Sequence, residues 1–155
     1  MADLNKLLTP LFLNEGEIRK ILELLFFSYR DFTEGPDKIL EKINFGRAHH
    51  RVIYFVSQNP NINVSELLAI LRITKQSLSR VLGKLVKEGF VKQRPGKQDR
   101  RKRLLELTNK GRELEQRLTQ TQLERVARTY RAAGADAVEG YRDVLLGMIN
   151  KDYQQ

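Results

Sequence analysis

The chain has 155 residues, a formal net charge of +9 and no cysteine. Its length suffices for one domain that buries a core without disulfides or metal ions. The lack of cysteine excludes thiol catalysis, thiolate-bound zinc and a disulfide framework, and it fits a reducing compartment. No run approaches the roughly 20 apolar residues of a membrane span, and the N-terminus MADLNKLLTP has no signal-peptide pattern. We therefore expect a cytoplasmic protein without a membrane partner.

The positive charge is concentrated in one part of the sequence. Residues 72–110 contain thirteen Lys and Arg but only three acidic residues, and the rest of the chain is nearly neutral. A protein that binds a polyanion through one face has this distribution. The densest part is RPGKQDRRKR at residues 94–103, where six cations surround a single carboxylate, Asp99.

Apolar residues at helical spacing predict several helices in the first part of the chain. Asn14 and Glu17 form a capping signal for the second of these helices. Residues 21–27 are apolar on nearly every side, so one helix face cannot account for them. Gly35 and Pro36 predict a break in the helical pattern. The predicted helices cover residues 4–12, 14–32, 37–42 and 44–58.

A turn at residues 59–61 precedes two helices that are joined by a tight connection. Asn63 and Glu66 repeat the capping signal for a short helix that ends near residue 72. The next helix has an apolar stripe, a polar and cationic face opposite that stripe, and an end at Gly89. A short helix, a tight turn and a second helix with an exposed cationic face form a helix-turn-helix.

Two short β-compatible runs, at residues 90–94 and 102–107, flank the cationic segment. We predict that they pair as a hairpin whose turn begins at Pro95 and Gly96. A helix-turn-helix followed by such a hairpin is a winged helix.

The helical pattern resumes after Thr108 and continues almost to the C-terminus. It predicts a long helix whose apolar pattern is interrupted in phase at residues 119–122. Asp136 and Glu139 predict the cap of a final helix.

Residues 64–111, VSELLAILRITKQSLSRVLGKLVKEGFVKQRPGKQDRRKRLLELTNKG, resemble the MarR family of bacterial transcription regulators. The similarity lies in the helix followed by EGFV, in the DRR of the hairpin loop and in the LTNKG that opens the next helix. It extends more loosely over residues 22–118.

The resemblance implies a mainly α fold with a small β-hairpin wing, in which a winged helix-turn-helix domain is flanked by N- and C-terminal dimerisation helices. It also implies a homodimer that reads a pseudo-palindromic operator, often under the control of a small ligand. A single MarR-type domain then covers residues 1–155, with dimerisation helices at 1–33 and 109–155, a DNA-binding lobe at 44–108, a helix-turn-helix at about 64–88 and a wing at about 90–107.

The second helix of the helix-turn-helix is the predicted recognition helix. Its first turn would enter the major groove, where Gln can pair with adenine and a cation can reach guanine, and later residues would follow the groove or bind phosphate. The alternative is a solvated helix face. Gly83 costs about 1 kcal/mol in a helix interior, and a close approach to DNA or to the hairpin would explain it equally well. The predicted contact residues are Thr74, Lys75, Gln76, Ser77, Ser79, Arg80 and Lys84.

In the wing, most cations would bind phosphate and contribute affinity with little sequence information. The resemblance implies that Arg101 enters the minor groove. Asp99 would then hold that arginine in position, and the alternative is a loop carboxylate that relieves repulsion between cations. The predicted phosphate contacts are Arg94, Lys97, Arg100, Lys102 and Arg103.

The terminal helices carry more apolar residues than a small winged helix needs, and a second copy of the chain would bury them. The alternative is a purely intrachain core. Besides residues 21–27, the predicted dimer residues are Leu4, Leu7, Leu8, Phe12, Tyr141, Leu145 and Ile149.

A ligand cleft between the dimer helices and the DNA-binding lobe is an open option. Adjacent helical residues such as His49 and His50 point about 100° apart, so we do not expect them to share a metal ion. Ordinary packing is the alternative for all of these side chains. The candidate cleft residues are Tyr29, Phe45, His49, His50 and Tyr54.

We therefore predict a homodimeric, sequence-specific DNA-binding transcription regulator, with repression favoured over activation and modulation by a small ligand left open. The alternative is a nonspecific nucleic-acid-binding or architectural protein. Gln, Ser and Thr on the recognition helix favour base reading, because a charge-only binder has no use for them. The sequence contains no phosphate-binding glycine loop, metal-ligand spacing or catalytic triad, so we predict no enzyme, cofactor or metal site.

Overall fold

The protein is described here by a computed structural model, which covers residues 3–11 and 13–149. Phe12, a predicted dimer residue, lies outside these ranges. The elements are α1 (Leu4–Leu8), the 3₁₀ helix η1 (Thr9–Leu11), α2 (Glu15–Glu41), α3 (Arg47–Gln58), α4 (Val64–Leu71), α5 (Lys75–Lys87), β1 (Val91–Pro95), β2 (Arg103–Leu107), α6 (Asn109–Ala133) and α7 (Ala135–Met148).

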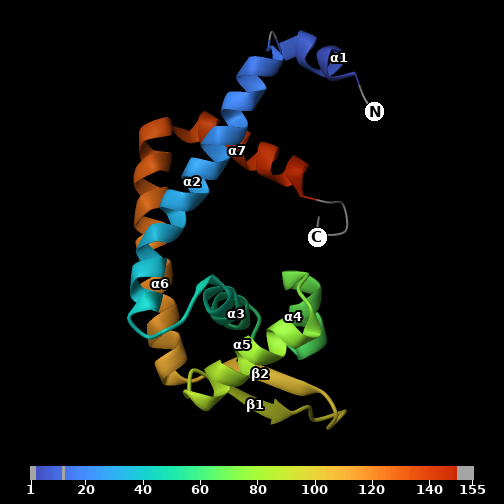
Figure 1. The fold of residues 1–155 in the computed structure, drawn as a ribbon, viewed down its shortest axis with the longest axis vertical. Coiled ribbons are helices and arrows are strands. Elements are labelled where there is room, and N and C mark those ends of the chain that lie inside the picture. Colours follow the sequence, from blue (N-terminus) through green and yellow to red (C-terminus); the bar gives the residue numbers. More distant parts are fainter. Residues whose placement is uncertain (1–2, 12, 150–155) are drawn as a thin grey trace.

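The molecule consists of a lobe and a set of helices that project from it (Figure 1). The lobe contains α3, α4, α5 and the antiparallel β1–β2 hairpin, in which Val91 pairs with Leu107 and Pro95 with Arg103. Helices α2 and α6 pack side by side as they leave the lobe, and α1 and α7 lie at the far end. The predicted fold class, a mainly α winged helix-turn-helix flanked by terminal helices, is confirmed.

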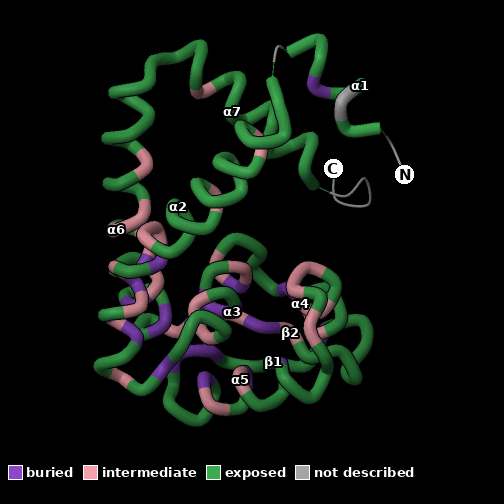
Figure 2. The backbone as a smooth tube through the Cα atoms, turned by 45° about the horizontal axis from the view of Figure 1, so that its top comes forward, coloured by how far each residue is buried: buried purple, intermediate pink, exposed green. Residues whose placement is uncertain are grey.

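The hydrophobic core lies inside the lobe and at its junction with α2 and α6 (Figure 2). The projecting ends of α2 and α6, and all of α7, are mostly exposed. Burial of apolar area therefore stabilises the lobe, whereas the terminal helices leave much of theirs in contact with water. The fully buried side chains include Leu40, Val52, Ile53, Leu67, Leu78, Leu85, Leu105 and Leu118.

The predicted break at Gly35 and Pro36 is wrong, because α2 continues through both residues. Pro36 has no N–H to donate to the carbonyl four residues earlier, that of Phe32. Gln122 of α6 supplies a replacement, since its Nε2 donates to the Phe32 carbonyl at 3.4 Å. A Cβ on Gly35 would lie 3.1 Å from Oγ1 of Thr121, so glycine lets the two helices approach closely. The Gly-Pro pair thus marks the crossing of α2 and α6.

The interruption in apolar phase at residues 119–122 does not break the helix, because α6 is continuous. Its polar side chains there bond within the helix or to α2. Thr119 Oγ1 donates to Glu115 Oε1 at 2.6 Å, and Thr121 Oγ1 donates to the Leu118 carbonyl at 2.9 Å. The change in apolar phase reflects these bonds and the contact of Gln122 with α2.

Several element boundaries differ from the prediction. Helix α3 begins at Arg47 and not at residue 44, because Asn44 adopts a left-handed conformation with φ of 55°. Strand β1 begins and ends one residue later than predicted. Strand β2 begins one residue later and ends at Leu107, as predicted. The predicted cap of the final helix by Asp136 and Glu139 is wrong, because the N-cap of α7 is Gly134 and Asp136 lies inside the first turn.

The terminal helices expose a broad set of apolar side chains. Of the predicted dimer residues that the structure describes, Leu8 is buried within the chain itself, with 6% exposure. The others are exposed, as are most of the apolar residues at 21–27. No helix in the described part of the chain is both long and apolar enough to cross a bilayer. The exposed members are Leu4, Leu7, Tyr141, Leu145 and Ile149, together with Ile21, Leu22, Leu24, Phe26 and Phe27.

Candidate nucleic-acid interface

The turn between α4 and α5 is held by side-chain caps at both helix starts. Asn63 and Glu66 form a reciprocal capping box, with bonds of 2.9 and 3.1 Å between each side chain and the other's backbone N–H. Helix α4 ends at Leu71, and its C-cap residue Arg72 takes a left-handed conformation with φ of 49°. Thr74 Oγ1 then accepts from the Ser77 N–H at 3.1 Å and donates to Ser77 Oγ at 2.9 Å. These bonds fix the start of the predicted recognition helix.

Helix α5 has a buried face and an exposed face. Leu78, Leu82 and Leu85 pack into the core. The opposite face carries the predicted base-reading and phosphate-binding side chains, which are free of ion pairs in the part of the chain that the structure describes. The exposed residues of this face are Lys75, Gln76, Ser79, Arg80, Gly83 and Lys87.

Lys84, although predicted to contact DNA, is engaged within the lobe. Its Nζ donates to the Asn44 carbonyl at 2.5 Å and lies 4.9 Å from the centre of the Phe45 ring. It also lies 4.0 Å from Glu88 Oε1. Lys84 therefore ties the recognition helix to the loop after α2.

The loop of the wing is closed by backbone hydrogen bonds. The Gly96 N–H donates to the Lys102 carbonyl at 2.9 Å, and the Lys102 N–H donates to the Asp99 carbonyl at 3.1 Å. A Cβ on Gly96 would lie 2.7 Å from that Asp99 carbonyl oxygen. Only glycine fits here without a shift of the loop, so Gly96 sets the shape of the tip.

The side chain of Asp99 bonds to the backbone of Arg101. Its Oδ1 accepts from the Arg101 N–H at 2.9 Å, and the Arg101 guanidinium forms no ion pair with any described residue. The carboxylate thus shapes the loop from which the arginine projects. The exposed wing cations without an ion pair in the described ranges are Lys97, Arg100, Arg101, Lys102 and Arg103.

Arg94 differs from the other wing cations, because it is held by two elements of the lobe. Its guanidinium donates to the side-chain oxygen of Asn61 in the α3–α4 turn. Its Nε lies 3.9 Å from Glu106 of β2, and Lys92 lies 3.3 Å from the same carboxylate. The roles of Asn61 and Glu106 are not among the predictions from the sequence. The NPN turn and the acidic residue on the second strand were the available signals.

The base of the wing is anchored to the start of α6. Thr108 Oγ1 donates to the Gly89 carbonyl at 2.6 Å, and Lys110 Nζ donates to the Glu88 carbonyl at 2.9 Å. A Cβ on Gly111 would come within 2.1 Å of the Phe90 carbonyl oxygen. The EGF and LTNKG segments therefore meet in space and connect the end of the recognition helix to α6.

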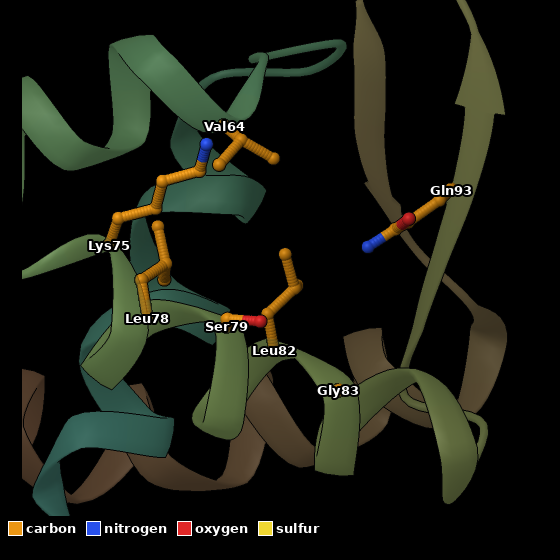
Figure 3. Close-up of a pocket in the computed structure, with 7 residues that line it drawn as sticks. All are labelled: Val64, Lys75, Leu78, Ser79, Leu82, Gly83 and Gln93. Atoms are coloured by element: carbon orange, nitrogen blue, oxygen red, sulfur yellow. The ribbon is translucent and has the colours of Figure 1, made fainter.

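A hollow of about 220 Å³ lies between α5 and the wing (Figure 3). A Cβ on Gly83 would meet nothing within 4 Å. The hairpin therefore does not approach this glycine closely, and that explanation of Gly83 is wrong. The lining residues are Val64, Lys75, Leu78, Ser79, Leu82, Gly83 and Gln93.

Both histidines lie on α3, and both have structural surroundings. The ring of His49 stacks on Phe45, with centroids 4.6 Å apart, and its Nδ1 accepts from the Gly46 N–H at 3.1 Å. Burial lowers the pKa of His49, with the nearby charge of Lys84 acting in the same direction. Burial also lowers the pKa of His50, against the opposing effect of Asp37. The neutral form of each ring is favoured.

The two tyrosines of the candidate cleft are exposed and lie apart from the described hollows. Tyr29 Oη accepts from the Arg51 guanidinium at 2.8 Å, which joins α2 to α3. Tyr54 makes an edge contact with Phe55. Two hollows in the described part of the chain are lined by other residues, one between α5 and the wing and one at the turn after α3. The five candidate cleft residues are therefore not gathered around either hollow.

Comparison with known proteins agrees with this arrangement. The MarR family model matches residues 43–102. The HTH-type transcriptional regulator PetP of Rhodobacter capsulatus is 47% identical over 142 residues, which are 92% of this chain and 86% of that protein.

Solved structures share the fold at lower identity. A mutant of MarR from E. coli in complex with operator DNA superposes with a TM-score of 0.67 and 21% identity, covering 86% of this chain and 96% of the other. A MarR transcriptional regulator from Methanosarcina mazei gives a TM-score of 0.67 and 24% identity, covering 88% of this chain and 89% of the other. The helix-turn-helix, the wing and the identity to PetP together place this chain in the MarR family.

Proposed function

We propose that this protein is a homodimeric, sequence-specific DNA-binding transcription regulator that acts in the cytoplasm. The observation that carries the proposal is the combination, on one lobe, of an exposed polar and cationic face of α5 with a wing tip of unpaired cations. Two such elements can occupy the major and minor grooves of one duplex. The relative PetP is named as a transcriptional regulator, and a MarR structure with the same fold holds operator DNA.

In this proposal α5 reads bases and the wing supplies affinity. Gln76 and Arg80 project from the exposed face of α5 and can bond to base edges in the major groove. Arg100, Lys102 and Arg103 would contact phosphates, and Arg101 would enter the minor groove. Arg94 and Lys84 contribute mainly by holding the wing and α5 in place, because both are engaged within the lobe.

The apolar surface of the terminal helices supports a dimer. Phe26 is 65% exposed, Leu22 60% and Val144 60%, and such a surface is unfavourable in water. A second copy that covers these residues would also place two recognition helices on one face of the duplex, matching a pseudo-palindromic operator. Sedimentation of the free protein as a stable monomer at micromolar concentration would overturn this part of the proposal.

Regulation would follow from occupation of the operator. We propose repression, because a dimer that covers its operator blocks a promoter that overlaps it. A small ligand that favours a dimer with a different spacing of its recognition helices would release the DNA. MarR-family proteins are regulators, so the expectation that the chain is not an enzyme is confirmed by its family.

Competition with random DNA tests the function. Duplexes enriched from a random library by the wild-type protein are labelled and challenged with excess random duplex. Binding that survives a roughly thousandfold excess supports a sequence-specific regulator. Loss in proportion to the competitor would support the nonspecific nucleic-acid-binding alternative.

A further inference from the structure

We propose that the hollow between α5 and β1 is the channel through which one DNA strand passes between the recognition helix and the wing. In this channel Gly83 provides room for the strand, and the side-chain amide of Gln93 binds its backbone. The inference rests on the DNA binding proposed above and adds a residue, Gln93, that lies outside the predicted contacts.

Gly83 has no structural reason within the chain to be glycine. It lies inside α5, where glycine is unfavourable relative to alanine, and its backbone is helical and not left-handed. A Cβ at this position would meet nothing within 4 Å. Because neither the conformation nor the packing of the protein requires glycine, we infer that the close neighbour is a bound partner.

Gln93 faces the hollow from the opposite side. Along β1 the side chains alternate, and Gln93 lies on the same face as the buried Val91. Lys92 and Arg94, on the other face, pair with Glu106. The amide of Gln93 is exposed, has no hydrogen-bond partner among the described residues and points toward α5 in Figure 3.

The lining of the hollow fits a sugar-phosphate strand. One such strand separates the major groove from the minor groove, so it must pass between a helix in one and a wing in the other. Val64 is partly exposed and offers an apolar contact to a deoxyribose, whereas Leu78 and Leu82 form the buried floor of the hollow. Ser79 and Gln93 offer hydrogen-bond donors to phosphate oxygens, and the surrounding segment is strongly cationic.

Variants of Gly83 separate protein stability from DNA binding. Gly83→Ala and Gly83→Leu fill open space on a helix, so the thermal midpoint of unfolding should rise by about 2–4 °C. If a DNA strand occupies that space, Gly83→Leu should weaken binding by about tenfold or more, and Gly83→Ala by less. Ala69→Leu, which adds similar bulk to an exposed position of α4, is the matched control. A Gly83→Leu protein that binds as tightly as the wild type would overturn the proposal.

Variants of Gln93 test the contact itself. Gln93→Glu keeps the shape but replaces the donor amide with a carboxylate, and it should weaken binding by about tenfold. Gln116→Glu makes the same change of charge on the exposed surface of α6 and should have little effect. Equal effects of the two substitutions would show that only net charge matters, and the proposal would then be wrong.

The choice of DNA separates this proposal from the proposed function. Each variant is measured on the duplex selected by the wild-type protein and on random duplex at low salt. A backbone contact should weaken both by the same factor, because it carries no sequence information. If the wild type selects no sequence, the regulator is disproved while the strand channel is still tested on random duplex. Normal binding of both variants to both duplexes disproves the channel.

Discussion

Asp99 holds the wing tip through the backbone of Arg101, since its Oδ1 accepts from the Arg101 N–H at 2.9 Å. From the sequence we expect the carboxylate to hold the arginine side chain through its charge. In the structure the carboxylate instead bonds to the backbone N–H of Arg101, and this bond sets the direction of the backbone where the arginine side chain leaves the loop. An uncharged oxygen in the same place would accept the same hydrogen bond.

We therefore expect Asp99→Asn to retain operator affinity and Asp99→Ala to lose about three- to tenfold, since one loop-ordering hydrogen bond contributes about 1 kcal/mol. Fluorescence anisotropy with the selected duplex measures both. Arg101→Ala should be at least as weak as Asp99→Ala. Equal losses for Asn and Ala would mean that the charge of Asp99, and not its hydrogen bond, is what the loop requires.

The crossing of α2 and α6 provides a stability prediction. The side chain of Gln122 donates a hydrogen bond to the Phe32 carbonyl, which Pro36 cannot do because it has no N–H. Gln122→Ala should lower the free energy of unfolding by about 1 kcal/mol, through the loss of a hydrogen bond to a carbonyl that Pro36 cannot reach with an N–H. Urea denaturation measures this change.

A double-mutant cycle supplies the control. Pro36→Ala restores an N–H that can bond to the Phe32 carbonyl within the helix. In that background Gln122→Ala should have a smaller effect than in the wild type. Additive effects of the two substitutions would mean that Gln122 and Pro36 are not coupled through this carbonyl.

The sequence predicts best those features whose determinants lie close together in the chain. The caps at Asn63 and Thr74 and the turn at Gly96 are local, so the helix-turn-helix and the wing follow from the sequence alone. The continuity of α2 does not, because Gln122 is 90 residues from its partner. The same limit applies to Arg94, whose partner Asn61 belongs to a different turn. The sequence alone does not show whether the side chain of a lysine or arginine will be bound within the folded protein.

The distinction between engaged and unpaired cations predicts the salt dependence of binding. Arg100 is exposed and unpaired within the described ranges, whereas Lys84 donates to the Asn44 carbonyl. Arg100→Ala should reduce the slope of log affinity against log salt by about 0.9, the amount for one phosphate contact. Lys84→Ala should leave the slope unchanged and lower thermal stability. Titrations at several salt concentrations would contradict this assignment if Lys84→Ala reduced the slope as much as Arg100→Ala.

The histidines of α3 predict a loss of stability in mildly acidic solution. Burial lowers the pKa of His49 and of His50 below the value of about 6.5 that histidine has in an unfolded chain. Below that value the unfolded chain takes up protons that the folded chain does not, so unfolding becomes more favourable as the pH falls. The stabilisation is fully present above pH about 6.5 and is lost as the pH falls through the folded pKa values. Protonation of His49 at Nδ1 would also remove the acceptor for the Gly46 N–H.

His49→Gln provides the test, because glutamine at the third position of a helix can accept from the same N–H without titrating. The urea midpoint of the wild type should be lower at pH 5.5 than at pH 7.5, and the difference should be smaller for the variant. This interval lies above the ordinary pKa of the carboxylates, so Asp31 and Glu34, whose pKa values are lowered by Arg30 and Lys38 respectively, remain ionised throughout. A wild type that is as stable at pH 5.5 as at 7.5 would contradict the neutral state of both rings. An unchanged decline in His49→Gln would assign the effect to His50, whose surroundings include Asp37, Glu115 and Arg51.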